Sequence, residues 1–572
     1  MPNYTSIRVT KVVHQQLQGY AESCYDGLSL TAALGQLLAD LGDGHVRFPE
    51  YGLFQCPAHR RERLRAVIGT QPPAGAGDMA GAVAGAVAGA VAGAVAGAVA
   101  GAVAGAVAGA GALPADPYTR VEKDTMGEME VPADALWGAS TQRAVLNFPV
   151  SGLRMGRSFI RALGCIKVAA ARANQQLELL DSGIAEAVEQ AALAVAEGEH
   201  DAHFPVDVFQ TGSGTSSNMN ANEVIARLAS ESLGSHVHPN DHVNLGQSSN
   251  DVVPTALHLS ALLELHGQLL PALLALQAAL EAKAVEFHAV IKTGRTHLMD
   301  ATPIRLGQEF EGYAGLVERA LDRLLVAQDE LAPLALGGTA VGTGVNTHPE
   351  FAGLACEELS QLAGIDVHET DNHFLAQSSL DGVLALGGAL RCLAVALQKI
   401  ANDIRWLGSG PRCGLAEIRL PSVQPGSSIM PGKVNPVIPE AVIQASAQAI
   451  ACDTALLQAA QGGYLELNTM LPLAAHNLLQ AIQLLGAAST IFGEKCIAGL
   501  EATGRGPELL QSGLMLATAL APVVGYEQAA KIAKAAHASG RTVLEEALEI
   551  TDLPEQELRE LLDPAGMVAP AS

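Results

Sequence analysis

Four polar, glycine-rich stretches separate apolar segments and carry the side chains best suited to chemistry. They span residues 210–218, 238–251, 292–297 and 426–436. Their hydroxyls, amides, histidine and lysine donate hydrogen bonds to a carboxylate without repelling it, and the stretches contain few acids. Helix capping by Ser, Asn and Asp would explain any one stretch alone. Because capping needs no histidine, lysine or glycine-rich approach, the four together predict a site for a carboxylate-bearing ligand.

The second and fourth stretches indicate how such a site could hold an anion. Ser248–Asn250 precede an expected helix, and the free N–H groups and dipole at a helix N-terminus favour an anion. In residues 426–436, Gly426 and Gly432 permit unusual backbone angles while two prolines restrict their neighbours. This combination predicts a loop able to fold over a ligand.

Three long apolar segments are expected to form the helices that position these stretches. Residues 251–286 are apolar on nearly every face, so we expect a rod of about 54 Å buried among other helices, with a kink at Pro271. Residues 374–407 and 436–460 have the same character. The chain has 572 residues, of which only 16% are charged and 4% aromatic, and this favours helices over β-sandwiches. The sequence therefore predicts an all-α bundle that continues across subunits.

Residues 1–70 form a separate region with a pattern of their own. Residues 6–10 alternate polar and apolar side chains as a half-exposed strand does, and helices are expected at 11–22 and 28–41. This order resembles a ribbon-helix-helix module, whose paired strands enter the DNA major groove. A small helical appendage or dimerisation arm is the plainer interpretation. The net charge of −25 argues against general affinity for nucleic acid or anionic membranes, so DNA binding by residues 1–70 is the less favoured hypothesis.

Residues 71–116 contain a low-complexity linker in which Ala-Gly-Ala-Val repeats from Ala80 to Ala110. The run is uncharged and long enough to span a bilayer, and its Gly-x-x-x-Gly spacing resembles a membrane helix-pairing motif. Glycine and alanine are nevertheless poor membrane residues, and no Trp, Tyr, Lys or Arg anchors lie next to the run. We expect a tether rather than a membrane span.

The eight cysteines are irregularly spaced and form no Cys-x-x-Cys pair. This pattern indicates reduced thiols in a cytoplasmic protein rather than a disulfide framework. The N-terminus also lacks the charged-then-apolar pattern of a signal peptide. Cys56 and His59 could supply two zinc ligands, but no second pair follows and structural zinc takes four ligands. No metal site is expected.

The stretch GSSIMPGKVNP at residues 426–436 resembles the signature of the fumarase/aspartase superfamily, and the other three stretches resemble its remaining shared blocks. The similarity runs from about Thr119 past residues 525–534 and is greatest to the class II fumarate hydratases. It implies an all-α homotetramer around a twenty-helix core, with active sites shared by three subunits. The implied reaction is the reversible hydration of fumarate to (S)-malate, with no metal or organic cofactor. After the linker we expect three domains, at residues 117–250, 251–500 and 501–572.

Two positions favour a fumarase over an aspartate ammonia-lyase within this superfamily. Thr296-His297 is the fumarase-like pair, since aspartases resemble this block but carry glutamine at the His297 position. Gly432 is also fumarase-like, where aspartases have alanine. Residues 437–440 are similar to aspartases but are shared by some fumarases. A DNA-binding regulator that carries a fumarase-like domain is the alternative from another class of protein.

The resemblance also implies roles for individual residues. Ser427 matches the loop serine that takes the C3 proton, His297 matches the histidine that acts with a bound water, and Glu440 matches the acid that supports it. The charge that develops on the neighbouring carboxylate needs preorganised donors, and a serine base needs positive charge and N–H groups nearby. The implied substrate contacts are Ser213, Gly214, Thr215, Ser248, Ser249, Asn250, Thr296, Ser428, Lys433, Val434 and Asn435.

An accessory site is implied less directly. Many family members bind a second dicarboxylate near a His-Pro-Asn-Asp sequence, helped by an arginine three residues before the histidine. Ser235 stands at the position of that arginine, and His236 could replace the cation only when protonated. Both a working and a lost accessory site therefore stay open. The candidate residues are His238, Pro239, Asn240 and Asp241.

Overall fold

The computed structural model describes residues 118–569. Residues 1–117 and 570–572 lie outside the described residues, and with them the strand-helix-helix module, the repeat-containing linker and the Cys56/His59 pair. The interpretations of those segments stay predictions.

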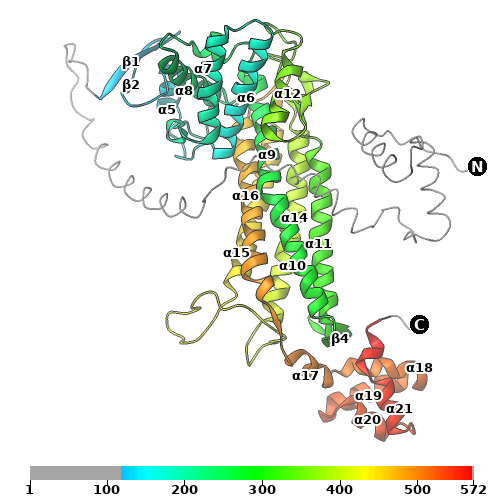
Figure 1. Ribbon diagram of the computed structural model, residues 1–572. Coiled ribbons are helices and arrows are strands. Elements are labelled where there is room, and N and C mark those ends of the chain that lie inside the picture. The colour runs from blue at the N-terminus through cyan, green and yellow to red at the C-terminus, as the bar shows by residue number, and fades with distance from the viewer. Residues whose placement is uncertain (1–117, 570–572) are drawn as a thin grey trace, which may run out of the picture. The chain divides into compact units, whose positions relative to one another are not determined.

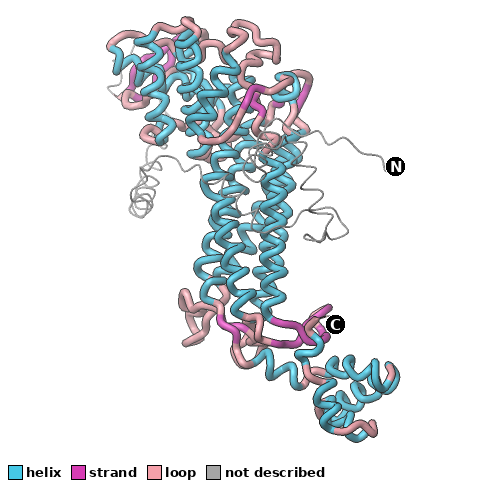
Figure 2. Tube along the Cα trace, turned by 45° about the vertical axis from the view of Figure 1, so that its right-hand side comes forward, coloured by secondary structure: helices cyan, strands magenta, loops and turns pink. Residues whose placement is uncertain are grey.

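Long helices that lie side by side form the centre of the described part of the chain (Figure 1). The expected all-α bundle is confirmed for residues 118–569, in which the strands form only short two-stranded sheets. Loops and strands gather beyond the ends of these helices (Figure 2). Leu, Ile, Val and Ala fill the core, and their burial is the dominant favourable contribution to folding. The long helices are α9 (Ser249–Glu264), α10 (Leu270–Glu286), α11 (Leu306–Gln328), α14 (Asp381–Leu407), α15 (Val437–Ala460) and α16 (Leu471–Lys495).

The helix expected over residues 251–286 is found as α9 and α10, joined by a π-helical turn at Leu265–Leu269. Pro271 is the second residue of α10, where a missing N–H group is tolerated. The π-helical turn, just before Pro271, changes the hydrogen-bond register of the helix. The expected kink near Pro271 therefore corresponds to a π-helical turn that ends two residues before the proline.

The prediction of one continuous helix over residues 374–407 is wrong at the N-terminal end, where the structure has two helices. A short helix, α13 (His373–Ser378), ends at Ser379, whose backbone is extended with φ −108° and ψ 155°. Helix α14 begins only at Asp381, whose N–H group donates to Ser379 Oγ over 3.3 Å. Serine hydroxyls compete for backbone groups in this way, which is why apolar periodicity alone misses such a break. The expectation for residues 436–460 is confirmed by α15.

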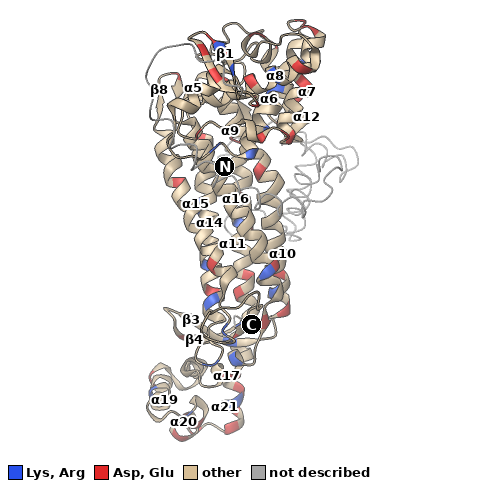
Figure 3. Ribbon diagram, turned by 90° about the vertical axis from the view of Figure 1, so that its left-hand side faces the viewer, with Lys and Arg blue, Asp and Glu red and all other residues tan. Residues whose placement is uncertain are grey.

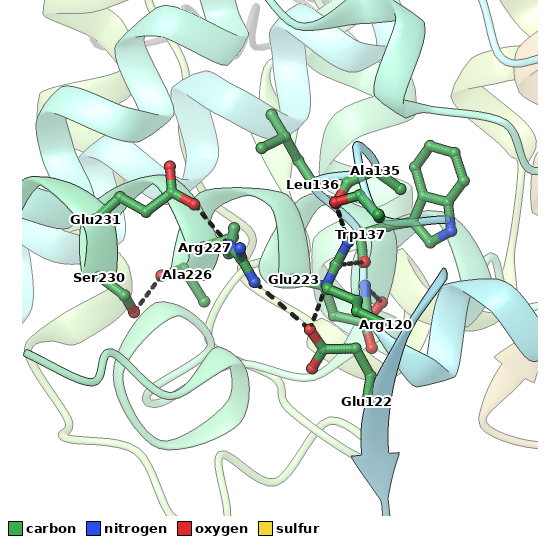
Figure 4. A network of polar contacts seen from close by, with 12 residues as sticks. Arg120, Glu122, Ala135, Leu136, Trp137, Glu223, Ala226, Arg227, Ser230 and Glu231 are labelled. Carbon is green, nitrogen blue, oxygen red and sulfur yellow. Dashed lines mark hydrogen bonds and ion pairs between the residues drawn. The ribbon is translucent and has the colours of Figure 1, made fainter. Parts of the chain in front are cut away.

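An antiparallel hairpin and five helices lie at the end of the bundle where α9 begins (Figure 1). Arg120 on the first hairpin strand donates to the carbonyl oxygens of Pro132, Ala135 and Trp137 over 2.6–2.8 Å. Glu122 on the same strand lies 3.6 Å from Arg227 of the helix α8, so polar contacts join the hairpin to the helices (Figure 4). The elements are β1 (Thr119–Asp124), β2 (Gly127–Pro132), α5 (Ala139–Asn147), α6 (Arg157–Gln176), α7 (Ser182–Glu197), α8 (Thr215–Leu233) and α12 (Phe351–Ala363).

The C-terminal helices form a small core of their own around Leu520, Ile532 and Leu558. The helices of this core are α18 (Ala521–Val524), α19 (Tyr526–Ser539), α20 (Val543–Ile550) and α21 (Glu555–Leu561), whereas α17 (Arg505–Gln511) precedes them and packs against the strand Ile291–Thr296. The expected divisions at residues 250 and 500 stay predictions. The remaining strands are β3 (Ile291–Thr296), β4 (Met299–Arg305), β5 (Pro333–Leu334), β6 (His368–Glu369), β7 (Ile418–Arg419), β8 (Gly463–Tyr464), β9 (Leu467–Asn468) and β10 (Glu501–Ala502).

Two segments of the bundle are long and apolar enough to cross a membrane, namely residues 249–286 and α14. Figure 3 shows that Lys, Arg, Asp and Glu residues are sparse along the middle of the long helices. About half of each apolar window is buried within the chain, 56% for residues 249–286 and 50% for α14. The other half of each window is left at least partly exposed on the surface of the described chain.

Candidate active site

The first two glycine-rich stretches meet at one end of the bundle. Thr215 Oγ1, in the first turn of α8, lies 2.9 Å from Ser213 Oγ and 2.7 Å from Ser249 Oγ. These hydroxyls, together with the first turn of α9, form the group of residues that we call the carboxylate cluster (Ser213–Thr215 and Ser248–Asn250). Hydroxyl groups and the N-terminus of a 16-residue helix make this cluster suited to an anion.

Two glycines bring these segments close together. Gly214 has φ +72°, and a Cβ atom on it would lie 2.7 Å from Val253 Cγ1 of α9. A Cβ atom on Gly212 would lie 1.8 Å from the carbonyl oxygen of Thr469. Only glycine fits both positions, so the backbone of this loop approaches its neighbours as closely as main-chain atoms allow.

Capping explains part of the second stretch. Ser248 is the N-cap of α9, and its Oγ accepts the N–H group of Asn250 over 3.2 Å. Asp251 completes the capping box, since its Oδ1 accepts the N–H group of Ser248 over 2.9 Å. Asn250 donates through Nδ2 to the carbonyl oxygen of Ala340 over 2.8 Å. Among the three residues, the hydroxyl of Ser249 is the one that points to the first stretch.

The groups behind this cluster could not be predicted from the four stretches. Asp251 Oδ2 accepts the N–H groups of Gly337 and Thr339 over 3.1 and 2.9 Å, so it fixes a fifth glycine-rich loop beside Asn250. Lys167 of α6 is also fully buried. Burial raises the pKa of Asp251 to about 6 and lowers the pKa of Lys167 to about 7. The fifth loop could have been found from its composition, GGTAVGTG, whereas nothing local singles out Lys167.

His297 lies at the tip of the β3–β4 hairpin at the other end of the bundle. Thr296 pairs with Met299, so His297 and Leu298 form a two-residue turn with φ +58° and +60°. Two positive φ angles define a type I′ turn, which fits the twist of the strands but costs energy for residues other than glycine. The histidine side chain is exposed, so it is accessible to another molecule that docks at the hairpin tip.

A buried group of charges holds this hairpin in place. Lys292 on β3 lies 3.1 Å from both Glu309 of α11 and Glu417, and Arg295 lies 2.9 Å from Glu417. Burial raises the pKa of Glu309, and the charge of Lys292 opposes that shift. Glu417 leads into the strand β7 that precedes the fourth stretch. The group thus connects the segment that carries His297 to the segment that carries Ser427.

The fourth stretch forms a closed loop before α15. The N–H group of Gly426 donates to the carbonyl oxygen of Lys433 over 2.8 Å, and Asn435 Nδ2 donates to the carbonyl oxygen of Gly426 over 2.6 Å. Ser427 Oγ accepts the N–H groups of Ile429 and Met430 over 3.3 and 3.0 Å. Donors aimed at a hydroxyl oxygen stabilise its alkoxide form.

The remaining residues of this stretch face outward. Ser428, Lys433 and Val434 are exposed along the loop. Glu440 is half-buried in the first turn of α15. The family resemblance implies roles in proton transfer or substrate contact for residues of two separate segments, and for the proposal below we refer to them together as the proton-transfer cluster: Thr296, His297, Ser427, Ser428, Lys433, Val434, Asn435 and Glu440.

The two clusters lie at opposite ends of the bundle (Figure 1). Residues 249–286 begin at the carboxylate cluster and end just before β3, and their 38 helical residues span about 57 Å at 1.5 Å per residue. The structure therefore brings the first stretch to the second within one chain, but keeps both far from His297 and Ser427.

The candidate accessory residues are engaged locally. His238 is the N-cap of the π-helical turn Pro239–Val243, and its Nδ1 accepts the N–H groups of Asn240 and Asp241 over 3.3 and 3.0 Å. The side chain of Asp241 is largely exposed. These contacts favour capping as the role of His238.

The described cysteines are free thiols, as expected, and burial raises the pKa of Cys356 and Cys496 to about 12. Within residues 118–569, no group of three or more His, Cys, Asp or Glu side chains is arranged to hold a metal ion.

Comparison with known proteins agrees with this architecture. The chain matches the family described as "Lyase" over residues 127–451 and the family described as "Fumarase C C-terminus" over residues 516–569. It is 53% identical over 452 residues to fumarate hydratase class II 2 of Pseudomonas aeruginosa, a match that covers 79% of this chain and 99% of that protein.

Solved structures give the same result. The crystal structure of recombinant class II fumarase from Schistosoma mansoni matches with a TM-score of 0.77 and 39% identity, covering 79% of this chain and 100% of that one. The native form of fumarate lyase:delta crystallin from Brucella melitensis matches with a TM-score of 0.73 and 47% identity, covering 78% and 100%. The helical bundle and the matched lyase domains define a member of the fumarase/aspartase superfamily. Within it, the chain belongs to the class II fumarate hydratases.

Proposed function

We propose that the chain is a homotetrameric fumarate hydratase of the cytoplasm that hydrates fumarate reversibly to (S)-malate at sites shared by three subunits. The observation that carries this proposal is the separation of the two clusters by about 57 Å. The carboxylate cluster offers hydrogen-bond donors without an acid or a base, and the proton-transfer cluster offers the acid and the base. Further copies of the chain supply the missing parts.

The carboxylate cluster binds the substrate in this proposal. The Thr215 hydroxyl lies 2.9 Å from that of Ser213 and 2.7 Å from that of Ser249, and the three hydroxyls donate to a substrate carboxylate. The N-terminal end of α9 adds its free N–H groups and positive dipole. This attraction is local, because the net charge of −25 works against an anionic substrate.

The proton-transfer cluster carries the chemistry. Ser427 acts as an alkoxide that the N–H groups of Ile429 and Met430 stabilise, and its Oγ takes a proton from C3 of malate and becomes a neutral hydroxyl. The electrons released at C3 move onto the neighbouring carboxylate, which becomes an aci-carboxylate. Donors such as Lys433 and Asn435 stabilise that charge where it develops.

Loss of water needs an acid on the opposite face of the substrate. His297, acting with a bound water, donates this proton to the departing hydroxyl, and Glu440 supports the histidine in its charged form. The exposed hairpin tip fits such a role, because it can reach into the carboxylate cluster of a neighbouring copy. Acid, base and donors complete the reaction, so no cofactor takes part in this proposal.

The uncovered apolar surface supports an assembly of several copies. Large apolar side chains on the bundle are about half exposed, among them Val395, Trp406 and Leu457. Burying them against other helices is worth about 25 cal/mol for each Å² removed from water. A bundle that continues across subunits would cover the faces of α14 and α15.

Absorbance of fumarate, measured with fumarate, malate and aspartate supplied separately, tests the activity. Interconversion of fumarate and malate is expected, while release of fumarate from aspartate would favour the aspartase alternative. His297→Gln should lower kcat by about 10²–10⁴-fold and leave the melting temperature unchanged, since glutamine keeps bulk and hydrogen bonding but cannot exchange a proton near pH 7. A folded variant that keeps more than about a tenth of the wild-type kcat would remove His297 from the proposal.

Mixing two inactive variants tests whether sites are shared. Ser249→Ala and His297→Gln alter different clusters, so some sites in mixed tetramers combine an intact cluster from each parent. Refolding an equal mixture should restore about a quarter of the wild-type activity, because a site then needs one intact copy from each of two chains. If the mixture is no more active than the separate variants, each site lies within one chain.

A further inference from the structure

Lys167 is a buried cation that the mechanism does not use. It lies on α6, has no exposed surface, and donates through Nζ to Asn244 Oδ1 over 3.0 Å and to Gln247 Oε1 over 2.9 Å. Both acceptors are neutral amides, and the charge of Asp251 acts on it only through space. Burying an ammonium group without a directly bound carboxylate is costly. A lysine at this position is therefore a poor choice for stability alone.

The amides that bind Lys167 shape the turn that enters the carboxylate cluster. Gln247 directly precedes Ser248, and its Nε2 donates to the carbonyl oxygens of Val243 and Leu245 over 3.2 Å. Asn244 donates through Nδ2 to the carbonyl oxygen of Gln247 over 3.0 Å. The ammonium group thus fixes two side chains that in turn fix the backbone up to the N-cap of α9.

The same amides also connect to the other half of the cluster. Asn218 and Asn222, both on α8, donate to Asn244 Oδ1 over 3.2 and 3.1 Å. Helix α8 begins at Thr215 of the first carboxylate-binding segment, and Gln247 directly precedes the second. The Asn244 side chain, which contacts α8 and Gln247, therefore connects the two segments. Lys167 lies behind this junction and, when protonated, adds its positive charge to the weaker fields of the helix ends.

We propose that Lys167 is a positioning residue for the substrate carboxylate: it orients Ser248–Asn250 through Gln247 and Asn244 and provides the positive charge behind them. The inference rests on the proposed function, because it assigns a role within the same substrate site. It concerns binding rather than proton transfer, since Lys167 donates to Asn244 and Gln247, which lead into the carboxylate cluster. The ground state and the transition state both carry the bound carboxylate, so loss of the charge should weaken both equally.

Lys167→Met tests this inference, because methionine keeps the length of the side chain and removes the charge. We expect KM for fumarate and for malate to rise about tenfold, equivalent to about 1.4 kcal/mol of binding, while kcat stays within about twofold. Lys283→Met is the matched control. Lys283 is a buried lysine of α10 that binds Glu286 and the carbonyl oxygen of Leu500, so its loss should lower stability without changing KM.

Succinate provides a second measurement that needs no turnover. It has both carboxylates of the substrate but no double bond, and its binding should raise the melting temperature of the folded protein. Lys167→Met should need about tenfold more succinate for the same increase. If the wild type binds succinate but hydrates no fumarate, the proposed function fails while the role of Lys167 is still decided by this titration.

Gln247→Leu covers the case in which Lys167→Met does not fold. It removes one of the two acceptors of Lys167 and should raise KM and the succinate requirement in the same way. Unchanged KM and unchanged succinate binding in the folded variant would overturn the inference. A fall in kcat at constant KM would overturn it too, because that result belongs to a group acting on the transition state alone.

Discussion

Glu417→Gln should both destabilise the chain and slow the reaction, because Glu417 holds the hairpin that presents His297. Its carboxylate is 1% exposed and lies 3.1 Å from Lys292 Nζ and 2.9 Å from Arg295. Lys292 keeps Glu309 as a partner, whereas Arg295 would face a neutral amide. Removing one partner of a buried ion pair costs about 3–5 kcal/mol, since the other charge stays buried without compensation.

Urea unfolding at one fixed protein concentration measures this loss of stability. Glu501→Gln is the matched control, because Glu501 pairs with Arg419 in the ladder that begins one residue after Glu417. The side chains of Arg419 and Glu501 are 71% and 58% exposed, and such exposed ion pairs contribute about 0–1 kcal/mol to stability. The two variants make the same chemical change and differ mainly in burial.

The kinetic effect follows from the position of the hairpin. A displacement of about 1 Å in a reacting group can cost about 10²-fold in rate, so Glu417→Gln should lower kcat by about that factor. KM should change little, because Glu417 contacts Lys292 and Arg295, which position the hairpin and belong to neither carboxylate-binding segment. A folded variant that loses less than about 1 kcal/mol and keeps the wild-type kcat would refute the reasoning.

Three further predictions concern single residues. Lys433→Ala should lower kcat/KM by about 10²–10³-fold, the effect of removing one oxyanion donor, and steady-state kinetics that show less than about a tenfold loss would contradict it. Gly214→Ala should lose about 1–3 kcal/mol in urea unfolding, because φ is +72° and the new Cβ would lie 2.7 Å from Val253, whereas Gly234→Ala, at φ +70° with open space, should lose less. Between pH 7 and 10.5 the unfolded chain binds a proton that Lys167 does not hold in the folded state, because burial lowers its pKa to about 7. Wild-type stability should therefore rise by up to about 1.4 kcal/mol per pH unit relative to Lys167→Met, and parallel urea profiles for the two proteins would contradict this.

Much of the bundle could be predicted because its signals are local. Apolar side chains around the whole circumference predict buried helices, and α15 matches its expected range within one residue. The hydroxyl and amide content of the four stretches likewise depends only on residue type, so a site for an anion could be predicted without coordinates. The break before α14 was missed, because it depends on serine hydroxyls that bind backbone groups rather than on apolar periodicity.

By itself, then, the sequence determined the helical class, the four glycine-rich stretches and the anionic character of the ligand. The tertiary structure decided which stretches meet, because the first two lie 34 residues apart at Thr215 and Ser249 yet share a hydrogen bond. It also decided the roles open to Lys167 and Glu417, whose partners lie 77 and 122 residues away along the chain. Burial and ion pairing at such separations depend on how the long helices return past one another, and no local pattern of residue types encodes that path.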